Sequence, residues 1–190
     1  ILPQGLDRHT FYGLDPGQAY PTKLERALAE QGLAVDMVNA GVSGDTSSGG
    51  RARLAWVLDG LDRPPALVIL ALGANDALRG IDPAITKRNI AAMIALLQQR
   101  AIPVLLAGML APPNMGAEYG TAFNRLYRDL ATAHDIAFYP FLLDGVAAQP
   151  ALNQDDGIHP NAEGVKVMVE GLLPMIASCL QGERASCRQN

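Results

Sequence analysis

The stretch Leu67-Val68-Ile69-Leu70-Ala71-Leu72 is an unbroken apolar run, and Gly73 ends it. A strand with one face in water would alternate apolar and polar side chains, so this run predicts a strand that is buried on both faces. Residues 103–109 repeat the pattern, and residues 136–139 form a shorter version of it. Strands of this kind belong to parallel sheets whose two faces are covered by helices.

The rest of the chain supplies further elements that fit such a sheet. Residues 34–40 predict a short strand, and Ile1-Leu2 predicts the end of a first strand. Helical patterns occupy residues 19–31, 50–61, 82–100, 119–134 and 162–180. This alternation of strands and helices predicts an α/β fold with a parallel sheet and helices on both faces.

Length and composition limit the possible classes of protein. The chain has 190 residues, and we predict a single domain over residues 1–181, followed by a tail, 182–190, that we interpret as disordered or non-native. The net charge of -4, without a basic cluster, argues against nucleic-acid binding. No apolar run reaches the length of a transmembrane helix. Cys179 and Cys187 match no metal-binding pattern, and the sequence leaves their pairing open.

Polar residues gather in the loops that follow three of the predicted strands, where sites form in parallel α/β folds. These loops hold residues 41–50, the pair Asn75 and Asp76, and the pair Asp156 and His159. Gly44 would let a substrate carbonyl approach a backbone N–H, although the hydroxyl residues that follow it also suit a helix cap. Asn75 fits either a turn or an amide that donates to an oxyanion.

The segment Asp155-Asp156-Gly157-Ile158-His159-Pro160 places a carboxylate and an imidazole three residues apart. A general base needs its imidazole held in one tautomer, which a neighbouring carboxylate achieves. The simpler interpretation is a glycine turn before a helix that proline starts. His134 ends a helical pattern and is interpreted as structural, and His9 is the third histidine. We predict no metal site and no cofactor, because histidines are few and phosphate-binding glycine motifs are absent from the sequence.

Three segments in this order resemble the sequence blocks of the SGNH hydrolases, also called the GDSL esterase family. They are residues 38–47, 72–80 and 155–160. The resemblance is strongest to the bacterial branch of multifunctional arylesterases, thioesterases and lysophospholipases. It implies a three-layer α/β/α, flavodoxin-like fold with a five-stranded parallel sheet.

The resemblance also implies roles for individual residues. His159 would be the general base and Asp156 its orienting carboxylate, while Gly44 and Asn75 would donate to the oxyanion hole. The reaction would be hydrolysis of a small carboxylic ester, thioester or lysophospholipid through a serine acyl-enzyme, without metal or cofactor. Relatives in this branch are often exported. The expected location is therefore periplasmic or secreted if a leader was removed before Ile1, and cytoplasmic otherwise.

The start of the chain departs from the family pattern Gly-Asp-Ser-Leu. An alignment without gaps on Gly5 and on Tyr12-Gly13-Leu14 places Leu6 where the Asp is expected. The same alignment places Asp7 where the nucleophilic Ser is expected. A carboxylate is a poor nucleophile toward an ester, because it would have to form a mixed anhydride and displace a far more basic alkoxide.

Three interpretations of Asp7 are open. Residues 1–12 differ from those of the functional protein, or the chain is an inactive relative that binds acyl ligands, or another serine acts. Ser43, Ser47 and Ser48 are the serines near the predicted site. We favour the first interpretation, because the departure is confined to the start of the chain. The loop 110–116 either lines an acyl pocket or forms a proline-rich turn, and acyl length is not predicted.

Overall fold

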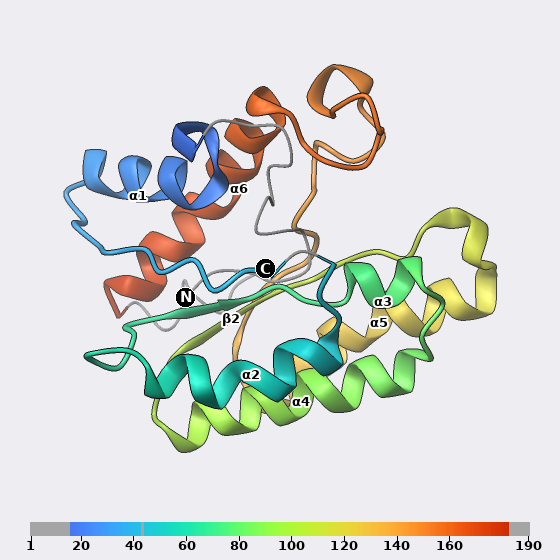
Figure 1. The fold of residues 1–190 in the computed structure, drawn as a ribbon, viewed down its shortest axis with the longest axis horizontal. Helices are drawn as coiled ribbons and strands as arrows, with labels where there is room; N and C mark the ends of the chain where they lie inside the picture. Colours follow the sequence, from blue (N-terminus) through green and yellow to red (C-terminus); the bar gives the residue numbers. More distant parts are fainter. Residues whose placement is uncertain (1–15, 43, 183–190) are drawn as a thin grey trace.

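A computed structural model describes residues 16–42 and 44–182, in which helices alternate with strands (Figure 1). The elements, in chain order, are η1 (Pro16–Gln18), α1 (Tyr20–Glu30), α2 (Ser47–Asp59), β1 (Val68–Leu70), α3 (Ala74–Leu78), α4 (Pro83–Gln99), β2 (Val104–Ala107), η2 (Pro113–Met115), α5 (Ala117–His134), β3 (Ala137–Tyr139), η3 (Pro150–Leu152) and α6 (Ala162–Leu180).

The three apolar runs form a parallel sheet in the order β1-β2-β3. Val68 aligns with Val104, and Leu105 aligns with Ala137. Every residue of β1 and β2 is buried. The prediction of strands at residues 67–72, 103–109 and 136–139 is therefore confirmed, because side chains without polar atoms can be buried on both faces of a sheet.

Helices cover both faces of this sheet. Figure 1 shows α1 and α6 on one side, and α2, α4 and α5 on the other. The predicted stripe of α1 is directed inward, since Leu24 and Leu28 are fully buried. All five predicted helices are present, and α2 begins at Ser47 because the side chain of Thr46 accepts a hydrogen bond from the backbone of Gly49.

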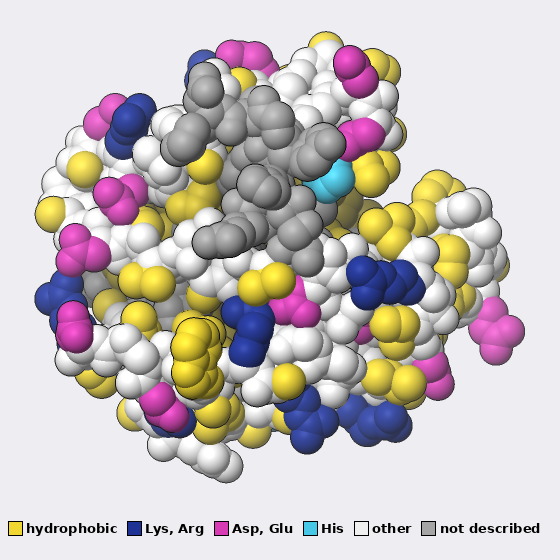
Figure 2. Space-filling model, in the orientation of Figure 1, with side chains coloured by type: hydrophobic (Ala, Val, Ile, Leu, Met, Phe, Trp, Pro, Cys, Tyr) yellow, Lys and Arg dark blue, Asp and Glu magenta, His cyan; other side chains and the backbone are white. Residues whose placement is uncertain are grey.

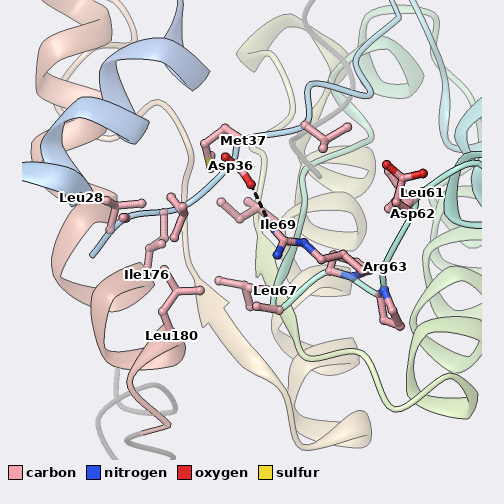
Figure 3. A pocket seen from close by; sticks show the side chains of 16 residues that line it. Leu28, Asp36, Met37, Leu61, Asp62, Arg63, Leu67, Ile69, Ile176 and Leu180 are labelled. Atoms are coloured by element: carbon pink, nitrogen blue, oxygen red, sulfur yellow. Dashed lines mark hydrogen bonds and ion pairs between the residues drawn. The ribbon is translucent and has the colours of Figure 1, made fainter. Parts of the chain in front are cut away.

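The predicted five-stranded sheet is not confirmed, because the described residues contain a sheet of three strands. The prediction of a strand at residues 34–40 is wrong: this segment belongs to no helix or strand. A cavity of about 800 Å³ is lined by Val35 and Met37 on one side and by Ile69 of β1 on the other (Figure 3). The segment therefore forms no hydrogen-bonded ladder with β1. The other predicted strand, Ile1-Leu2, lies outside the described residues.

The helices and the cysteines bear on two further sequence predictions. Within residues 16–42 and 44–182, no helix combines the length and the apolar character needed to cross a membrane. Cys179, near the end of α6, is disulfide-bonded. Cys187 and most of the predicted tail lie outside the described residues.

Candidate active site

The carboxyl ends of the three parallel strands lie at one edge of the sheet. Asn75 follows β1 at this edge, and the segment that contains Asp156 and His159 follows β3. The loop that begins near Leu110 follows β2. The fold therefore brings three segments that are far apart in the sequence to the same edge of the sheet.

Asp156 and His159 are joined directly. The Oδ2 atom of Asp156 lies 2.6 Å from Nδ1 of His159. Its Oδ1 atom accepts from the backbone N–H groups of Ile158 and His159, each at 3.0 Å. Gly157 between them has a φ of 73°, a left-handed conformation that glycine adopts without steric cost. A single carboxylate thus closes the turn and orients the imidazole.

The hydrogen bonds to Asp156 also control its charge. The backbone N–H of His159, together with its side chain and the N–H of Ile158, lowers the pKa of Asp156 from 3.8 to about 2. The carboxylate is therefore ionised at neutral pH and can only accept hydrogen bonds. It follows that Nδ1 of His159 carries a hydrogen and donates a hydrogen bond to Asp156, so that in the neutral imidazole the lone pair lies on Nε2.

Short-range hydrogen bonds stabilise the segment that carries this pair. The backbone N–H of Gln154 donates to the carbonyl of His159 at 2.7 Å. The side chain of Asn153 donates to the carbonyls of Val146 and Gln149 at 2.7 and 2.8 Å. Just after the pair, Asn161 caps α6 by accepting from Glu163 and Gly164. The base segment is therefore fixed mainly by neighbours in the sequence.

Asn75 lies in the first turn of α3, two residues after Gly73, whose backbone conformation favours glycine. Gly73 has a φ of 114°, and a Cβ atom there would lie 2.1 Å from the hydroxyl oxygen of Tyr127. That hydroxyl donates to the carbonyl of Leu72 at 2.7 Å. Only glycine combines the positive φ with the lack of a Cβ that would clash with Tyr127. Gly73 therefore turns the chain sharply from the strand into the helix that carries Asn75.

Gly44 is linked to the same region by two contacts. Arg79, at the end of α3, donates from Nη2 to the carbonyl of Gly44 at 2.8 Å. Ser47, three residues after Gly44, binds the carboxylate of Asp76, which follows Asn75. These contacts bring the Gly44 and Asn75 segments together. Asp76 and Arg79, which join these segments, were not predicted from the sequence, although both follow Asn75 within the third block of the family resemblance.

The structure narrows the search for a nucleophile among the described serines. Ser47 is fully buried and its hydroxyl is bound to Asp76, so a substrate cannot reach it. The hydroxyl of Ser48 accepts from the side chain of Asn89 at 2.8 Å. Asp7, the predicted nucleophile position, and Ser43 both lie outside the described residues, as does His9. His134 ends α5, where it contacts Gln98 at 3.2 Å, away from this edge.

Large apolar side chains are exposed on the segments that follow β1, β2 and β3. Leu78 follows Asn75 by one turn of helix, Leu110 follows β2, and Ile158 precedes His159; they are 53%, 46% and 51% exposed. Figure 2 shows hydrophobic side chains on the walls of a hollow next to a histidine. The loop that starts at Leu110 is held to α5, because the backbone of Ala111 donates to Asn124 at 2.8 Å. Exposed apolar groups around a polar site suit an apolar ligand.

The described residues contain no group of three or more His, Cys, Asp or Glu side chains that could hold a metal ion. The cavity of Figure 3 lies elsewhere, between the segment around Met37, the start of β1 and the end of α6. Asp36 and Arg63 form an exposed ion pair at this cavity, at 2.7 Å. None of the candidate residues Gly44, Asn75, Asp156 and His159 lines it.

Comparison with known proteins gives a consistent result. A model of the GDSL-like lipase/acylhydrolase family matches residues 5–167. The chain is 40% identical over 168 residues to esterase TesA of Pseudomonas aeruginosa. This match covers 88% of this chain and 83% of that protein. It is 34% identical over 152 residues to thioesterase 1/protease 1/lysophospholipase L1 of Escherichia coli K12. This match covers 80% of this chain and 71% of that protein.

The structural comparison agrees with the sequence comparison. The crystal structure of the psychrotrophic esterase EstA from a Pseudoalteromonas species, inhibited by monoethylphosphonate, superimposes with a TM-score of 0.85 at 25% identity. The match covers 94% of this chain and 97% of that one.

Proposed function

Because the chain belongs to the GDSL-like lipase/acylhydrolase family, we propose that its site hydrolyses carboxylic esters through a covalent acyl-enzyme. The observation that carries this proposal is the contact of 2.6 Å between Asp156 and His159. It holds the imidazole in the tautomer that accepts a proton at Nε2. A surface histidine without such a carboxylate would be free to adopt either tautomer.

In the proposed first step, a hydroxyl nucleophile attacks the substrate carbonyl while Nε2 of His159 takes its proton. The carbonyl oxygen becomes an oxyanion, to which the backbone N–H of Gly44 and the side-chain amide of Asn75 donate. The intermediate collapses, and the leaving alcohol or thiol departs with the proton from His159. Water then repeats these steps on the acyl-enzyme and releases a carboxylic acid.

The nucleophile is the part of this mechanism that the present sequence does not supply. In the proposed alignment Asp7 occupies its position. A functional chain would carry serine there, whereas the chain with Asp7 would bind acyl ligands without turning them over. Asp7 is thus the observation that favours the second candidate function, an inactive acyl-binding relative.

The substrate class follows from the surroundings of the site. Leu78 and Ile158 expose large apolar side chains on the segments that carry Asn75 and His159, and Leu110 does so in the loop that follows β2. An acyl chain packed on them would be partly removed from water, which stabilises binding by about 0.8 kcal/mol for each buried CH₂ group. We therefore propose esters and thioesters with apolar acyl groups, lysophospholipids included, as substrates.

The proposal is tested by hydrolysis of a p-nitrophenyl acyl ester. We expect no turnover by the chain with Asp7 and clear turnover after Asp7→Ser. Adding His159→Ala to Asp7→Ser should lower kcat by about 10⁴- to 10⁶-fold, because the general base is lost. The matched control is His134→Ala in the same background, which removes a histidine at the end of α5 and should leave kcat within about twofold.

Each outcome separates the two candidate functions. Turnover that depends on Asp7→Ser and on His159 supports the hydrolase. Binding of a fatty acid without turnover, even after Asp7→Ser, would support the acyl-binding relative. Hydrolysis by the unaltered chain that a serine-directed phosphonate abolishes would show that another serine acts.

A further inference from the structure

Asp76 is a carboxylate with no exposed surface at the start of α3, directly after Asn75. Removing a carboxylate from water is unfavourable unless protein donors replace the lost water. The carboxylate of Asp76 therefore requires hydrogen-bond donors from the protein, and the elements that supply these donors are held to α3 by it.

Ser47 supplies two of these donors. Its backbone N–H donates to Oδ2 of Asp76 at 2.8 Å, and its hydroxyl donates to Oδ1 at 2.5 Å. One residue thus binds both oxygens of the carboxylate, which fixes the distance and the rotation of α2 relative to α3. The side chain of Asn89 donates to the Ser47 hydroxyl at 3.0 Å and fixes its direction.

Thr86 supplies a third donor to the same carboxylate. Its hydroxyl donates to Oδ1 of Asp76 at 2.9 Å, and it is also fully buried. Thr86 lies on α4, so this hydrogen bond joins α3 to α4 and does not involve the Gly44 segment. Ser47 and Thr86 therefore make similar buried hydrogen bonds that join different parts of the molecule.

The chain between Gly44 and Ser47 is short, and hydrogen bonds of Asp45 hold it in place. The backbone N–H of Asp45 donates to the carbonyl of Val42 at 3.2 Å. The Asp45 carboxylate accepts from Arg53 at 2.9 Å. A shift of Ser47 would consequently be passed on to Gly44, because little freedom remains between them.

We infer that Asp76 and Ser47 are positioning residues for the oxyanion hole. The hydrogen bond between the Ser47 hydroxyl and the Asp76 carboxylate sets the spacing between the Gly44 N–H and the Asn75 amide. This inference rests on the proposed function of Gly44 and Asn75 as oxyanion donors. Neither Asp76 nor Ser47 touches the substrate. Their effect is to keep two donors on separate elements in the arrangement that the transition state requires.

The first test needs no enzymatic activity and uses the chain as it is. Amide hydrogen exchange is measured for Asp45, whose N–H is bonded to Val42, in Ser47→Ala and in Thr86→Val. We expect Ser47→Ala to speed exchange of Asp45 by about tenfold or more, and Thr86→Val to leave it nearly unchanged. Equal exchange of Asp45 in the two variants would overturn the inference.

The second test measures kinetics in the Asp7→Ser background. Ser47→Ala should lower kcat by about tenfold or more with KM within about twofold, since only transition-state binding is affected. Ser47→Thr, which keeps the hydroxyl, should restore most of kcat. Thr86→Val should change kcat by less than about threefold, although it also removes a hydrogen bond from Asp76. A purely structural role would predict similar kcat losses in Ser47→Ala and Thr86→Val.

The two tests fail independently. Faster exchange of Asp45 with an unchanged kcat in Ser47→Ala would overturn the positioning role while the proposed function stands. An inactive Asp7→Ser chain would overturn the proposed function, and the exchange of Asp45 would then decide alone whether Ser47 holds the Gly44 segment. If Ser47→Ala fails to fold, Asp76→Asn replaces it in both tests with the same expected results.

Discussion

The two halves of the proposed site are held in place in different ways. In the base half, Asp156 binds Ile158 and His159, which lie two and three positions away, and the Asp156 side chain is 38% exposed. The oxyanion half depends on the contact of Ser47 with Asp76, which is buried and joins residues 29 positions apart. One half is encoded locally, and the other is assembled by the fold.

This difference has consequences for mutation. A change in the base half should affect chemistry with little effect on folding, because its hydrogen bonds are local and solvent can replace some of them. A change in the oxyanion half should affect both the chemistry and the folding, because its groups are packed against the sheet and α4. Variants of each half test this contrast, and all kinetic effects below refer to the Asp7→Ser background.

Asp156→Asn should lower kcat by about 10³- to 10⁴-fold. An asparagine amide facing Nδ1 would favour the tautomer with the proton on Nε2, which cannot accept a proton from the nucleophile. The thermal unfolding midpoint should fall only slightly, because the segment keeps its backbone hydrogen bonds. Steady-state kinetics and calorimetry measure the two quantities. A large loss of stability with normal kcat would contradict the description of the base half.

Asn75→Ala should lower kcat by about 10²- to 10³-fold and leave KM nearly unchanged. Its amide is proposed to donate more strongly to the oxyanion than to the ground-state carbonyl. Initial rates over a range of p-nitrophenyl ester concentrations separate kcat from KM. If only KM rose, Asn75 would bind the substrate without stabilising the transition state.

Gly73→Ala should lower the free energy of unfolding by about 2–4 kcal/mol. The added Cβ would lie 2.1 Å from the Tyr127 hydroxyl at a φ of 114°. Gly120→Ala is the matched control, since a Cβ there meets nothing within 4 Å inside α5 and should stabilise by about 0.5–1 kcal/mol. Urea denaturation measures both variants, and equal stability of the two would contradict the packing described around Gly73.

The pH dependence of stability should show the smallest effect. The pKa of Asp156 falls to about 2 in the folded protein, mainly through the His159 N–H. A lowered pKa stabilises the fold above the unfolded value of about 4, and this contribution is lost as the pH falls from about 4 through 2. The thermal midpoints of the native chain and of Asp156→Asn should therefore converge over this range. A difference that stayed constant down to pH 2 would contradict the ionised pair.

The same contrast explains which features could be predicted from the sequence. The spacing of Asp156 and His159 and the helix that begins after Asn161 depend on local chemistry, so the motif predicted their geometry. The buried runs likewise predicted β1, β2 and β3. The contact of Asp76 with Ser47 depends on how α2 packs beside α3, which no local pattern encodes. The predicted strand at residues 34–40 failed for a related reason, because a strand also requires a neighbour to pair with, and among the described residues the sheet contains only β1, β2 and β3.

The proposed site is tested most directly by phosphonate labelling of the Asp7→Ser chain, followed by peptide mass mapping. A serine-directed phosphonate reacts with a nucleophile that is activated by a base and an oxyanion hole. We expect a single adduct on the peptide that carries position 7, and its loss when His159→Ala is added. An adduct on the peptide containing residues 43–48, or an adduct that forms equally well without His159, would contradict the proposed site.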